Sequence, residues 1–507
     1  MTIKNIFTKT LLASSLMLMS GAASAAAFQL AEVSTSGLGR AYSAEAAIGD
    51  NASVVATNPA LMTMFDRSMF SAGGIYIMPN LDVEGRINGT YHDKQTKVAP
   101  NELVPSMYFV TPVNDKFAVG AGINVNYGLA TAYDNDFNMG FFGGKTNLVA
   151  TNFNVSGAYR YNNHLSFGLG ANVVYAKAKV ERRVGKLPGA VAIAAVDNKQ
   201  ELLHKAQGYV SKHPEFAPQF GALQNKLQTL SQKVGNNDEA LKQYLASKAE
   251  QIAEKGNNIT SDTVLAKLTG SKVGFGVNAG VLYEFDKNNR IGLAYHSPVK
   301  IKFKGKFSNG LPSSLNIPGL SPDSELAGKI NGLYQNKFHP TNGNEIDGSL
   351  DLTLPAYAEL SGYHKVTNQL AMHYSVKWTQ WSSFDKLHAV GDNGDTLFEK
   401  QEGFRDSMRV ALGATYDVNK ALTLRTGIAY DESAIGEFQT ISIPDTDRTW
   451  YSVGATYKFT PDLSMDVAYT YVQGKKTRFI EKEGLLVGKF NTKASVNLVG
   501  INFNYSF

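Results

Sequence analysis

Apolar and polar side chains alternate with a period of two along most of the chain after Asp66. In the stretch LSFGLGANVVY, apolar residues occupy every odd position from Leu165 to Tyr175, and small or polar residues occupy most even positions. This alternation predicts β-strands with one apolar face. Fourteen segments share the pattern, near residues 68–80, 104–113, 116–129, 148–161, 165–182, 271–285, 290–306, 348–366, 369–387, 403–417, 420–432, 447–459, 463–474 and 490–507.

The connections between these segments alternate strictly between short and long. The short ones resemble turns and lie near residues 114–115, 162–163, 286–289, 367–368, 419 and 461–462. The long ones lie near residues 81–103, 130–147, 183–270, 307–347, 388–402, 433–446 and 475–489. Such sidedness is typical of outer-membrane barrels, which have periplasmic turns and longer extracellular loops. We therefore predict an all-β fold, a 14-stranded antiparallel transmembrane β-barrel, in preference to a water-soluble β-sandwich.

The last predicted strand ends in GINFNYSF, with Phe503, Tyr505 and Phe507 on one face. A soluble protein would cover such a face, whereas the lipid-facing side of a barrel leaves it in hydrocarbon. We expect this strand to pair with the first one, which closes the sheet and removes its edges. A terminal phenylalanine is also similar to the signal read by the outer-membrane barrel assembly machinery. The alternative is a frayed amphipathic tail.

The N-terminal residues have the pattern of an export signal. Two lysines precede a short apolar run that ends before Ala23-Ser24-Ala25, so we expect a signal peptide over residues 1–25 with cleavage after Ala25. Residues 26–67 are rich in small side chains and lack sustained alternation. A 14-stranded barrel is too wide for its own side chains to fill. We therefore predict that residues 26–67 form a hatch inside a barrel of residues 68–507; a periplasmic extension is the alternative.

Two of the long connections contain further structure. Within 183–270, apolar residues recur at helical spacing before Gly235 and again before Gly256, which predicts two helices. Connection 307–347 is also rich in leucine and isoleucine. The two loops could pack on each other, or they could leave an apolar groove that is open to water and suits an apolar ligand.

Composition excludes several classes of function. The chain has 507 residues, no cysteine and a formal net charge of +5, which falls to +3 if the two signal-peptide lysines are removed. This charge gives no argument for nucleic-acid binding. No GxSxG, HExxH or GxxxxGK[ST] motif is present, and the nine histidines are scattered. We therefore expect no enzymatic activity, no metal site and no cofactor.

Three features carry a positive argument, each with a plainer alternative. Asn58-Pro59-Ala60 lies near the end of the expected hatch, where it could be an ordinary turn. The parity of the strand that begins at Leu165 points Arg182 into the lumen, where it needs an anion, although an isolated surface arginine is the alternative. The same parity argument places Asn126 and Gly128 on an inner face of small and polar residues. The strand could kink there, or these residues could simply line the barrel.

Many motifs in order resemble the FadL family of outer-membrane long-chain fatty acid transporters. They are AAFQL, SGLGRAYSAEAAIGD, NPALMTMFDR, NVNYGLAT, SGAYRYNNHLSFGLGANVVYAKAKVER, YEFDKNNR, VKIKFKG, GDTLFEKQEGFRD, TGIAYDES, ISIPDTDR and GINFNYSF. The resemblance runs from the expected cleavage point to the last residue and is weakest in 183–270 and 307–347. It implies a 14-stranded barrel with a hatch in the outer membrane of a Gram-negative bacterium, which agrees with the strand count above.

The resemblance also implies site residues. The family's hatch motif falls on Asn58, Pro59 and Ala60, and the basic residues near the ligand head group fall on Arg182 and Lys400. Phe28 at the start of the hatch is implied to contribute to the same site. The family's kinked third strand, which opens the wall sideways, falls on Asn126, Tyr127 and Gly128.

The implied function is passive uptake of long-chain fatty acids. The loops capture the ligand, a lumenal pocket binds it, and a gap in the barrel wall releases it laterally. The alternatives are uptake of aromatic or aliphatic hydrocarbons, or a surface-binding adhesin barrel that agents such as phages exploit. We expect a monomer whose partners are fatty acids, outer-membrane lipid and lipopolysaccharide.

Overall fold

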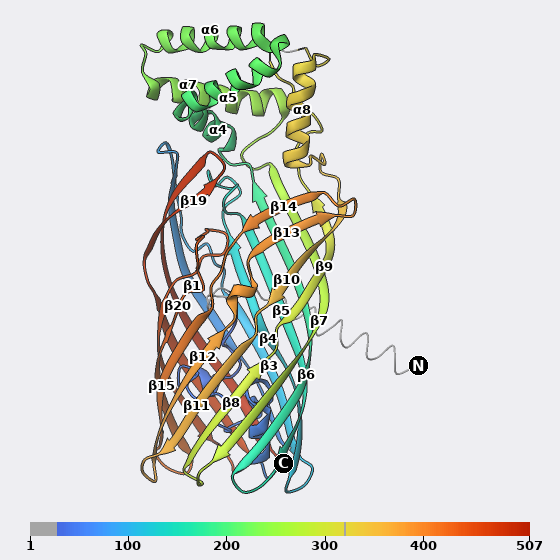
Figure 1. Ribbon diagram of the computed structural model, residues 1–507. Helices are drawn as coiled ribbons and strands as arrows, with labels where there is room; N and C mark the ends of the chain where they lie inside the picture. The colour runs from blue at the N-terminus through green and yellow to red at the C-terminus, as the bar shows by residue number, and fades with distance from the viewer. Residues whose placement is uncertain (1–27, 319–320) are drawn as a thin grey trace.

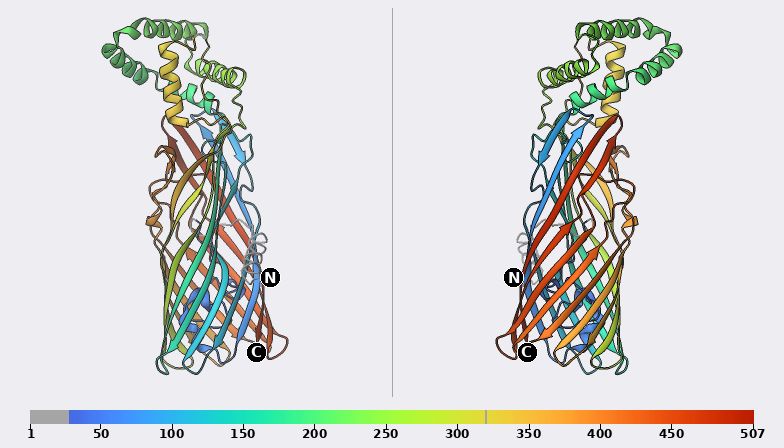
Figure 2. Two further views of the ribbon diagram at one scale, coloured as in Figure 1. Left: turned by 90° about the vertical axis from the view of Figure 1, so that its right-hand side faces the viewer. Right: turned by 90° about the vertical axis from the view of Figure 1, so that its left-hand side faces the viewer.

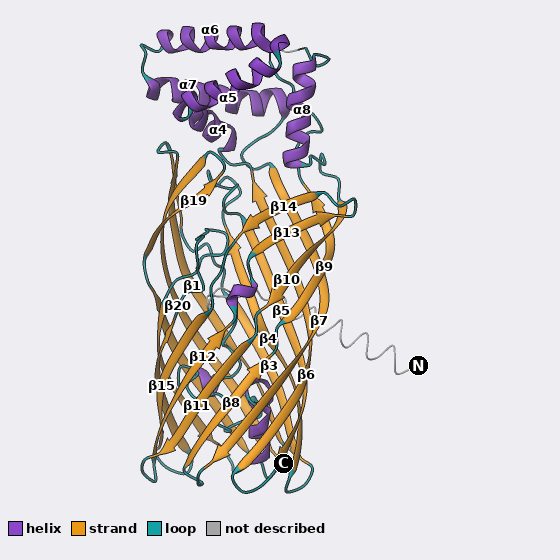
Figure 3. Ribbon diagram, viewed as in Figure 1, coloured by secondary structure: helices purple, strands orange, loops and turns teal. Residues whose placement is uncertain are grey.

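The computed structural model describes residues 28–318 and 321–507 (Figure 1). The predicted signal peptide and its cleavage after Ala25 therefore lie outside the described residues. Among the described residues, no helix is long and apolar enough to cross a membrane. Strands make up a tall, closed wall, while helices gather over one end and a few short ones lie inside (Figure 3).

Twenty strand segments, all paired antiparallel, form the wall. They are β1 (Met69–Ile87), β2 (Tyr91–Gln95), β3 (Glu102–Pro112), β4 (Phe117–Ala132), β5 (Lys145–Arg160), β6 (Leu165–Arg183), β7 (Val264–Glu284), β8 (Asn289–His296), β9 (Val299–Ser308), β10 (Ile346–Leu354), β11 (Tyr357–Lys365), β12 (Leu370–Thr379), β13 (Lys386–Gly391), β14 (Thr396–Gln401), β15 (Ser407–Asp417), β16 (Leu422–Asp431), β17 (Arg448–Lys458), β18 (Leu463–Gly474), β19 (Thr477–Glu483) and β20 (Leu486–Ser506).

In the described part of the chain, the twenty segments form fourteen long strands that cross the wall of one barrel. We call each of these long strands a stave, whether it consists of one segment or two. Each of six pairs of consecutive segments continues as one stave across a short break: β2 with β3, β8 with β9, β10 with β11, β12 with β13, β14 with β15, and β18 with β19. β20 pairs with β1 along the whole of Met69–Ile87, so the last stave closes on the first. The predicted 14-stranded antiparallel barrel is confirmed.

Three connections predicted as long loops are β-hairpins instead. Residues 81–103, 388–402 and 475–489 contain the upper parts of β1–β2, β13–β14 and β19–β20. Their turns carry glycines with positive φ, at Gly89, Gly394 and Gly484. The apolar alternation stops before these hairpins because a strand that projects beyond the bilayer has no lipid to contact. The alternation therefore predicts only the part of each strand that lies within the membrane.

The outer and inner faces of the wall differ as the alternation predicts. On β6, Phe167, Leu169 and Tyr175 are exposed on the outside, while even-numbered Ser166 and Asn172 are buried inside. At the chain end, Phe503, Tyr505 and Phe507 are 47–57% exposed. Apolar side chains that would be unfavourable in water are therefore placed where a bilayer would cover them.

The N-terminal segment from Phe28 to Arg67 lies within the barrel as a hatch, drawn in blue near the end with the short turns (Figure 1). It contains α2 (Thr35–Leu38), α3 (Val54–Thr57) and the 3-10 helix η1 (Pro59–Met64). Glycines on the inner wall let the hatch backbone approach: a Cβ added at Gly292 would lie 1.8 Å from the Ala46 carbonyl oxygen, and one at Gly427 would lie 2.2 Å from that of Arg40. The predicted location of the hatch inside the lumen is confirmed.

A helical cap covers the opposite end of the barrel in both side views (Figure 2). It contains α4 (Leu187–Asp197), α5 (Lys199–Lys212), η2 (Pro214–Phe216), α6 (Ala217–Lys233), α7 (Asp238–Gln251), the π-helical turn η3 (Ile252–Gly256) and α8 (Glu325–Phe338). The two predicted helices correspond to α6 and α7. Val184, Leu311 and Tyr334 share one apolar cluster, so the two loops pack on each other, as the first of the two alternatives proposed.

Candidate functional site

An apolar cavity lies in the lumen above the hatch. The empty space between its lining residues amounts to about 720 Å³, part of which is open to solvent. The lining is almost entirely hydrocarbon. It includes Phe28, Leu129, Leu148, Ala178, Val180, Leu268, Phe303, Phe307, Leu350, Leu352, Phe384, Leu387, Leu397 and Ile443, with Thr146 and Ser349 among its few polar side chains.

Phe28, the first described residue, lies in an aromatic cluster on this cavity. Its ring centroid is 4.6 Å from that of Trp381 and 5.2 Å from that of Phe384, both in edge-on arrangements. Trp381 belongs to the 3-10 helix η4 (Trp381–Ser383), in the short segment that interrupts the stave of β12 and β13. Phe28 therefore contributes aromatic carbon to the cavity, which is the environment that a ligand tail requires.

Arg182 lies near the upper end of β6, and its side chain is buried. Its Nη1 donates to Thr146 Oγ1 at 3.3 Å and to the Glu181 carbonyl oxygen at 3.0 Å. Its Nη2 is buried without a hydrogen-bond partner in the described structure. Because an unsatisfied guanidinium N–H in a dry environment is costly, this donor is suited to an anionic ligand at the edge of the cavity.

Lys400 lies on β14 and already has a carboxylate partner. Its Nζ is 2.6 Å from Glu481 Oε1, and both side chains are largely buried. Glu481 comes from β19, and its other oxygen, Oε2, accepts a hydrogen bond from the Ile441 backbone N–H at 3.0 Å. Neither cation lines the cavity itself, but Leu397 on β14 and Thr146 do.

A second buried carboxylate lies in this group. Glu402 follows β14, outside the strands, and is fully buried. Burial raises the pKa of Glu402 to about 7 against the opposing charge of Lys400, while the negative charge of Glu481 raises it further. Thr440 Oγ1 donates to its Oε2 at 3.3 Å, and its Oε1 has no partner within the described residues. A protonated Glu402 could donate to a ligand carboxylate through this oxygen.

Sequence reasoning missed both carboxylates. The sequence pattern predicts a loop at Glu481, although Thr477, Phe479 and Glu481 alternate with exposed Arg478 and Ile480, as expected for a strand. Only the pairing of Glu481 with Lys400, across 81 residues of chain, reveals its role. Glu402 lies two residues after Lys400, but the alternation of apolar and polar residues does not distinguish a buried glutamate from an exposed one.

The third stave, β4, leaves its neighbour halfway up the wall. β3 pairs with β4 only as far as Ile123, and beyond it the described residues show no β3–β4 pairing, although β3 stays paired with β1 as far as Glu102. The first hatch residues take this place: Gly128 N donates to the Phe28 carbonyl oxygen and Leu30 N donates to that of Asn126, both at 2.8 Å. The seam between β3 and β4 is therefore closed partly by the hatch.

The predicted inward parity at Gly128 is wrong. The register of β4 against β5 shifts between Val125 and Tyr127, and such an irregularity reverses the faces beyond it. The Tyr127 hydroxyl donates to the Pro355 carbonyl oxygen at 2.8 Å, and Leu129 lines the cavity. A one-residue irregularity of this kind leaves no sign in a pattern of small residues.

The hatch motif is fixed by close contacts with the wall. Asn58 caps η1 by accepting from the Ala60 N–H at 3.0 Å, and its Nδ2 donates to the carbonyl oxygens of Ala46 and Val281. A Cβ at Gly168 would lie 2.4 Å from the Pro59 carbonyl carbon. Asn58, Pro59 and Ala60 therefore serve as a docking point between hatch and barrel and lie apart from the apolar cavity.

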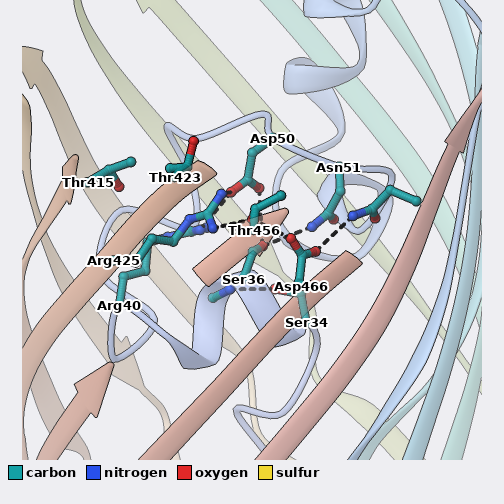
Figure 4. A network of polar contacts seen from close by, with 12 residues as sticks. Ser34, Ser36, Arg40, Asp50, Asn51, Thr415, Thr423, Arg425, Thr456 and Asp466 are labelled. Carbon is teal, nitrogen blue, oxygen red and sulfur yellow. Dashed lines mark hydrogen bonds and ion pairs between the residues drawn. The ribbon is translucent and has the colours of Figure 1, made fainter. Parts of the chain in front are cut away.

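A second hatch contact is ionic (Figure 4). Asp50 in the hatch accepts from Arg40 at 3.0 Å and from Arg425 of β16 at 3.2 Å, which links hatch to wall. Ser36 and Asn51 complete the network. Because breaking a buried ion pair costs about 3–5 kcal/mol, this network favours a seated hatch.

Comparisons with known proteins agree with this architecture. The family described as "Outer membrane protein transport protein (OMPP1/FadL/TodX)" matches residues 16–507. The 47 kDa outer membrane protein of Pasteurella multocida is 50% identical over 502 residues, with 99% of each chain covered. The long-chain fatty acid transport protein of Escherichia coli K12 is 42% identical over 508 residues, with both chains fully covered.

Solved structures show the same fold. A Pseudomonas aeruginosa FadL homologue gives a TM-score of 0.69 at 20% identity, covering 95% of this chain and 99% of its own. The toluene transporter TodX of Pseudomonas putida gives 0.58 at 15% identity, covering 95% and 100%. The family match spans nearly the whole chain, and its members are transport channels of the outer membrane, not enzymes. This chain belongs to the FadL family of outer-membrane transport proteins.

Proposed function

We propose that this protein carries long-chain fatty acids passively across the outer membrane. The observation that carries the proposal is an apolar lumenal cavity beside Arg182, whose buried Nη2 has no partner among the described residues. A fatty acid matches this arrangement because its tail is hydrocarbon and its head is an anion. The relative in Escherichia coli K12, 42% identical over the full length, is named for the same transport.

Binding combines burial of the tail with pairing of the carboxylate. Each buried CH₂ contributes about 0.8 kcal/mol, so a tail of about sixteen carbons contributes at most about 12 kcal/mol. The carboxylate pairs with Arg182 and with Lys400, and it competes with Glu481 for Lys400. Because Arg182 Nη2 is unpaired and Lys400 is not, Arg182 supplies the larger share of the head-group affinity.

Release follows the seam at β4. The hydrogen bonds from Gly128 to Phe28 and from Leu30 to Asn126 join cavity, hatch and wall in one place. Movement of the hatch start removes Phe28 from the cavity and frees the edge of β4 at the same time. The ligand then leaves laterally, and the bilayer offers its tail hydrocarbon in place of water. A concentration gradient and downstream consumption suffice to drive uptake.

The unpaired donor of Arg182 argues against hydrocarbons as the ligand class. Hydrocarbons such as toluene have no anion, so they leave Arg182 Nη2 unsatisfied, whereas a fatty acid satisfies it. An adhesin needs no apolar cavity. Recognition of Phe507 by the assembly machinery, binding of lipopolysaccharide, a monomeric state and use by phages stay predictions.

Growth on oleate as the sole carbon source, with and without this gene, tests the function. We expect growth to require the gene in a host that lacks other such transporters. Equal growth without it, at matched expression of the remaining uptake machinery, contradicts the proposal. Binding of oleate and of toluene to the purified barrel then separates the two ligand classes.

A further inference from the structure

The outward face of β9 carries an uninterrupted row of lysines. Its sequence VKIKFKGKFS places Val299, Ile301 and Phe303 inside, where they are buried at the lumenal core. The residues between them point outward and are exposed: Lys300, Lys302, Lys304 and Lys306. Neighbouring outward positions on one strand are about 6.6 Å apart, so the row extends over about 20 Å.

Neighbouring strands widen this row into a surface. On β6, Lys177 is exposed and the Lys179 side chain is 42% exposed, while Lys267 lies on β7. The pairing aligns them across the wall: Lys177 is opposite Ser271, and Ser271 is opposite Lys304. In the next row, Lys179 and Lys306 flank Thr269. We call Lys177, Lys179, Lys267, Lys300, Lys302, Lys304 and Lys306 the lysine surface.

The lysine surface begins where the lipid-facing band ends. On β6 the outward side chains change from Val173 and Tyr175, both exposed apolar residues, to Lys177. On β7 they change from exposed Phe275 and Val273 to Ser271. This boundary lies toward the helical cap, on the side of the barrel where β6, β7 and β9 run side by side (Figure 1). Lys304 is paired with Ser271 at this boundary, so Lys177, Lys179, Lys304 and Lys306 lie at the height of the head groups of the outer leaflet, while Lys302 and Lys300 continue the row below it.

The charge of the lysine surface is incompletely balanced within the chain. Asp347 pairs with Lys306 at 2.6 Å, and Glu181 pairs with Lys179 at 3.2 Å. No carboxylate lies within 4.0 Å of the other five lysines in the described parts of the chain. Aligned cations repel one another, so their accumulation at one depth favours binding of an external anion.

The opposite side of the barrel has a different character. Along β1, the outward residues beyond exposed Tyr76 include Asp82, Glu84 and Arg86, and exposed Lys493 of β20 lies opposite Asp82. Cations and anions are therefore mixed on this side of the wall, whereas every outward position of β9 from Lys300 to Lys306 is a lysine.

We propose that the lysine surface binds the phosphate groups of the outer-leaflet glycolipid, lipopolysaccharide. Its position across the upper edge of the apolar band lets a single lipid place its acyl chains against Tyr175 and Phe275 and its phosphates against the lysines. Ammonium groups on long flexible stems reach phosphates at several depths without a fixed geometry. Of the seven lysines, Lys306 alone also borders the lumenal cavity, so this binding does not require that the barrel carries fatty acids.

The test uses the full-length protein in detergent micelles and purified diphosphorylated lipid A as the probe. The variant replaces Lys300, Lys302, Lys304 and Lys306 by Gln, which retains side-chain length and removes four charges. We expect lipid A affinity to fall at least tenfold and the salt dependence of binding to weaken. The matched control replaces four helical-cap lysines, Lys199, Lys205, Lys226 and Lys233, by Gln and should change affinity less than twofold.

Three outcomes overturn the proposal. Affinity within twofold of wild type in the β9 variant shows that its lysines do not bind the lipid. Equal loss in the helical-cap control shows a nonspecific charge effect. Equal binding of dephosphorylated lipid A by the wild type shows that phosphate is not recognised. If the fourfold variant does not fold, Lys302→Gln with Lys304→Gln replaces it, with at least a threefold loss expected and an unchanged affinity overturning the proposal.

Discussion

Lys400 Nζ and Glu481 Oε1 lie 2.6 Å apart, in a pair of largely buried side chains joined across β14 and β19. Without ligand, the charge of Lys400 is therefore already compensated. A fatty acid carboxylate that approaches Lys400 must compete with Glu481. The structure thus contains an internal anion that tempers the affinity for the ligand, and a transporter must release what it binds.

Replacement of Glu481 by Gln should tighten fatty acid binding. Gln retains an oxygen that can accept from the Ile441 N–H but removes the charge that competes for Lys400. We expect a gain of about 1 kcal/mol, or about fivefold in Kd. Titration of the purified barrel with oleate measures it. Weaker binding by Glu481→Gln would show that Glu481 supports the site by positioning alone.

Arg182→Ala should weaken oleate binding far more than any change at an exposed arginine. Truncating one partner of a buried charge pair costs about 2–5 kcal/mol, so Kd should rise by at least about thirtyfold. Arg182→Lys should recover part of this loss, because it restores the charge without the second N–H. Arg86→Ala, at an exposed position of β1, is the matched control. An Arg182→Ala protein with wild-type affinity would remove Arg182 from the head-group site.

Oleate binding should weaken as pH rises through about 7. The pKa of Glu402 is raised by burial from 4.5 to about 7, so this carboxyl is neutral below that pH and negative above it. Above pH 7 the charge of Glu402 repels the ligand, and its burial penalty also lowers the stability of the folded state. Titrations of wild type and Glu402→Gln between pH 5.5 and 8.5 check this, since the ligand's own ionisation affects both. Identical profiles for the two proteins would exclude Glu402.

Gly280→Ala should loosen the hatch. The added Cβ would lie 1.8 Å from Asn58 Oδ1, which caps η1. Such overpacking costs about 1–3 kcal/mol, so amide hydrogen exchange in Pro59–Met64 should accelerate by fivefold or more. Gly157→Ala on β5 is the control, because a Cβ there meets nothing within 4 Å. Equal exchange in the two variants would mean that Asn58 does not seat the hatch.

A larger side chain at Gly128 should slow oleate uptake and leave the affinity for oleate nearly unchanged. The Gly128 N–H bonds the Phe28 carbonyl oxygen at the seam of β4, while the cavity is lined by Leu129 beside it. We expect Gly128→Val to reduce the rate of oleate uptake by about tenfold with Kd changed less than about twofold. Uptake assays in cells and titrations of purified protein separate the two quantities. Equal losses in both would argue against lateral release.

The membrane-spanning part of this fold could be predicted from sequence because lipid enforces one repeated rule. Each strand needs an apolar outward face, so Leu165 to Tyr175 is recognisable without any partner strand. Above the bilayer that rule ends, and the pattern predicts a loop where the β19–β20 hairpin lies. Only part of the candidate site could be predicted from the sequence: the parity of the strand indicates Arg182, and the family resemblance implies Lys400.

What sequence could not supply depends on contacts between distant segments. Glu481 becomes informative only beside Lys400, and Glu402 only once its burial is known. The register shift after Val125 reverses the parity of β4 without changing its composition. The close fit of Gly280 against Asn58 also arises from the tertiary fold, because glycine on an inner wall is otherwise ordinary lining.

Protection of a single cysteine inside the cavity tests the central claim most directly. The chain has no cysteine, so Ala178→Cys, in the cavity lining, places one unique thiol there. The account predicts that saturating oleate slows alkylation of this thiol at least tenfold, while Gly157→Cys on β5 reacts at an unchanged rate. Unchanged alkylation of Ala178→Cys, under conditions where oleate is bound, would contradict binding in the lumen.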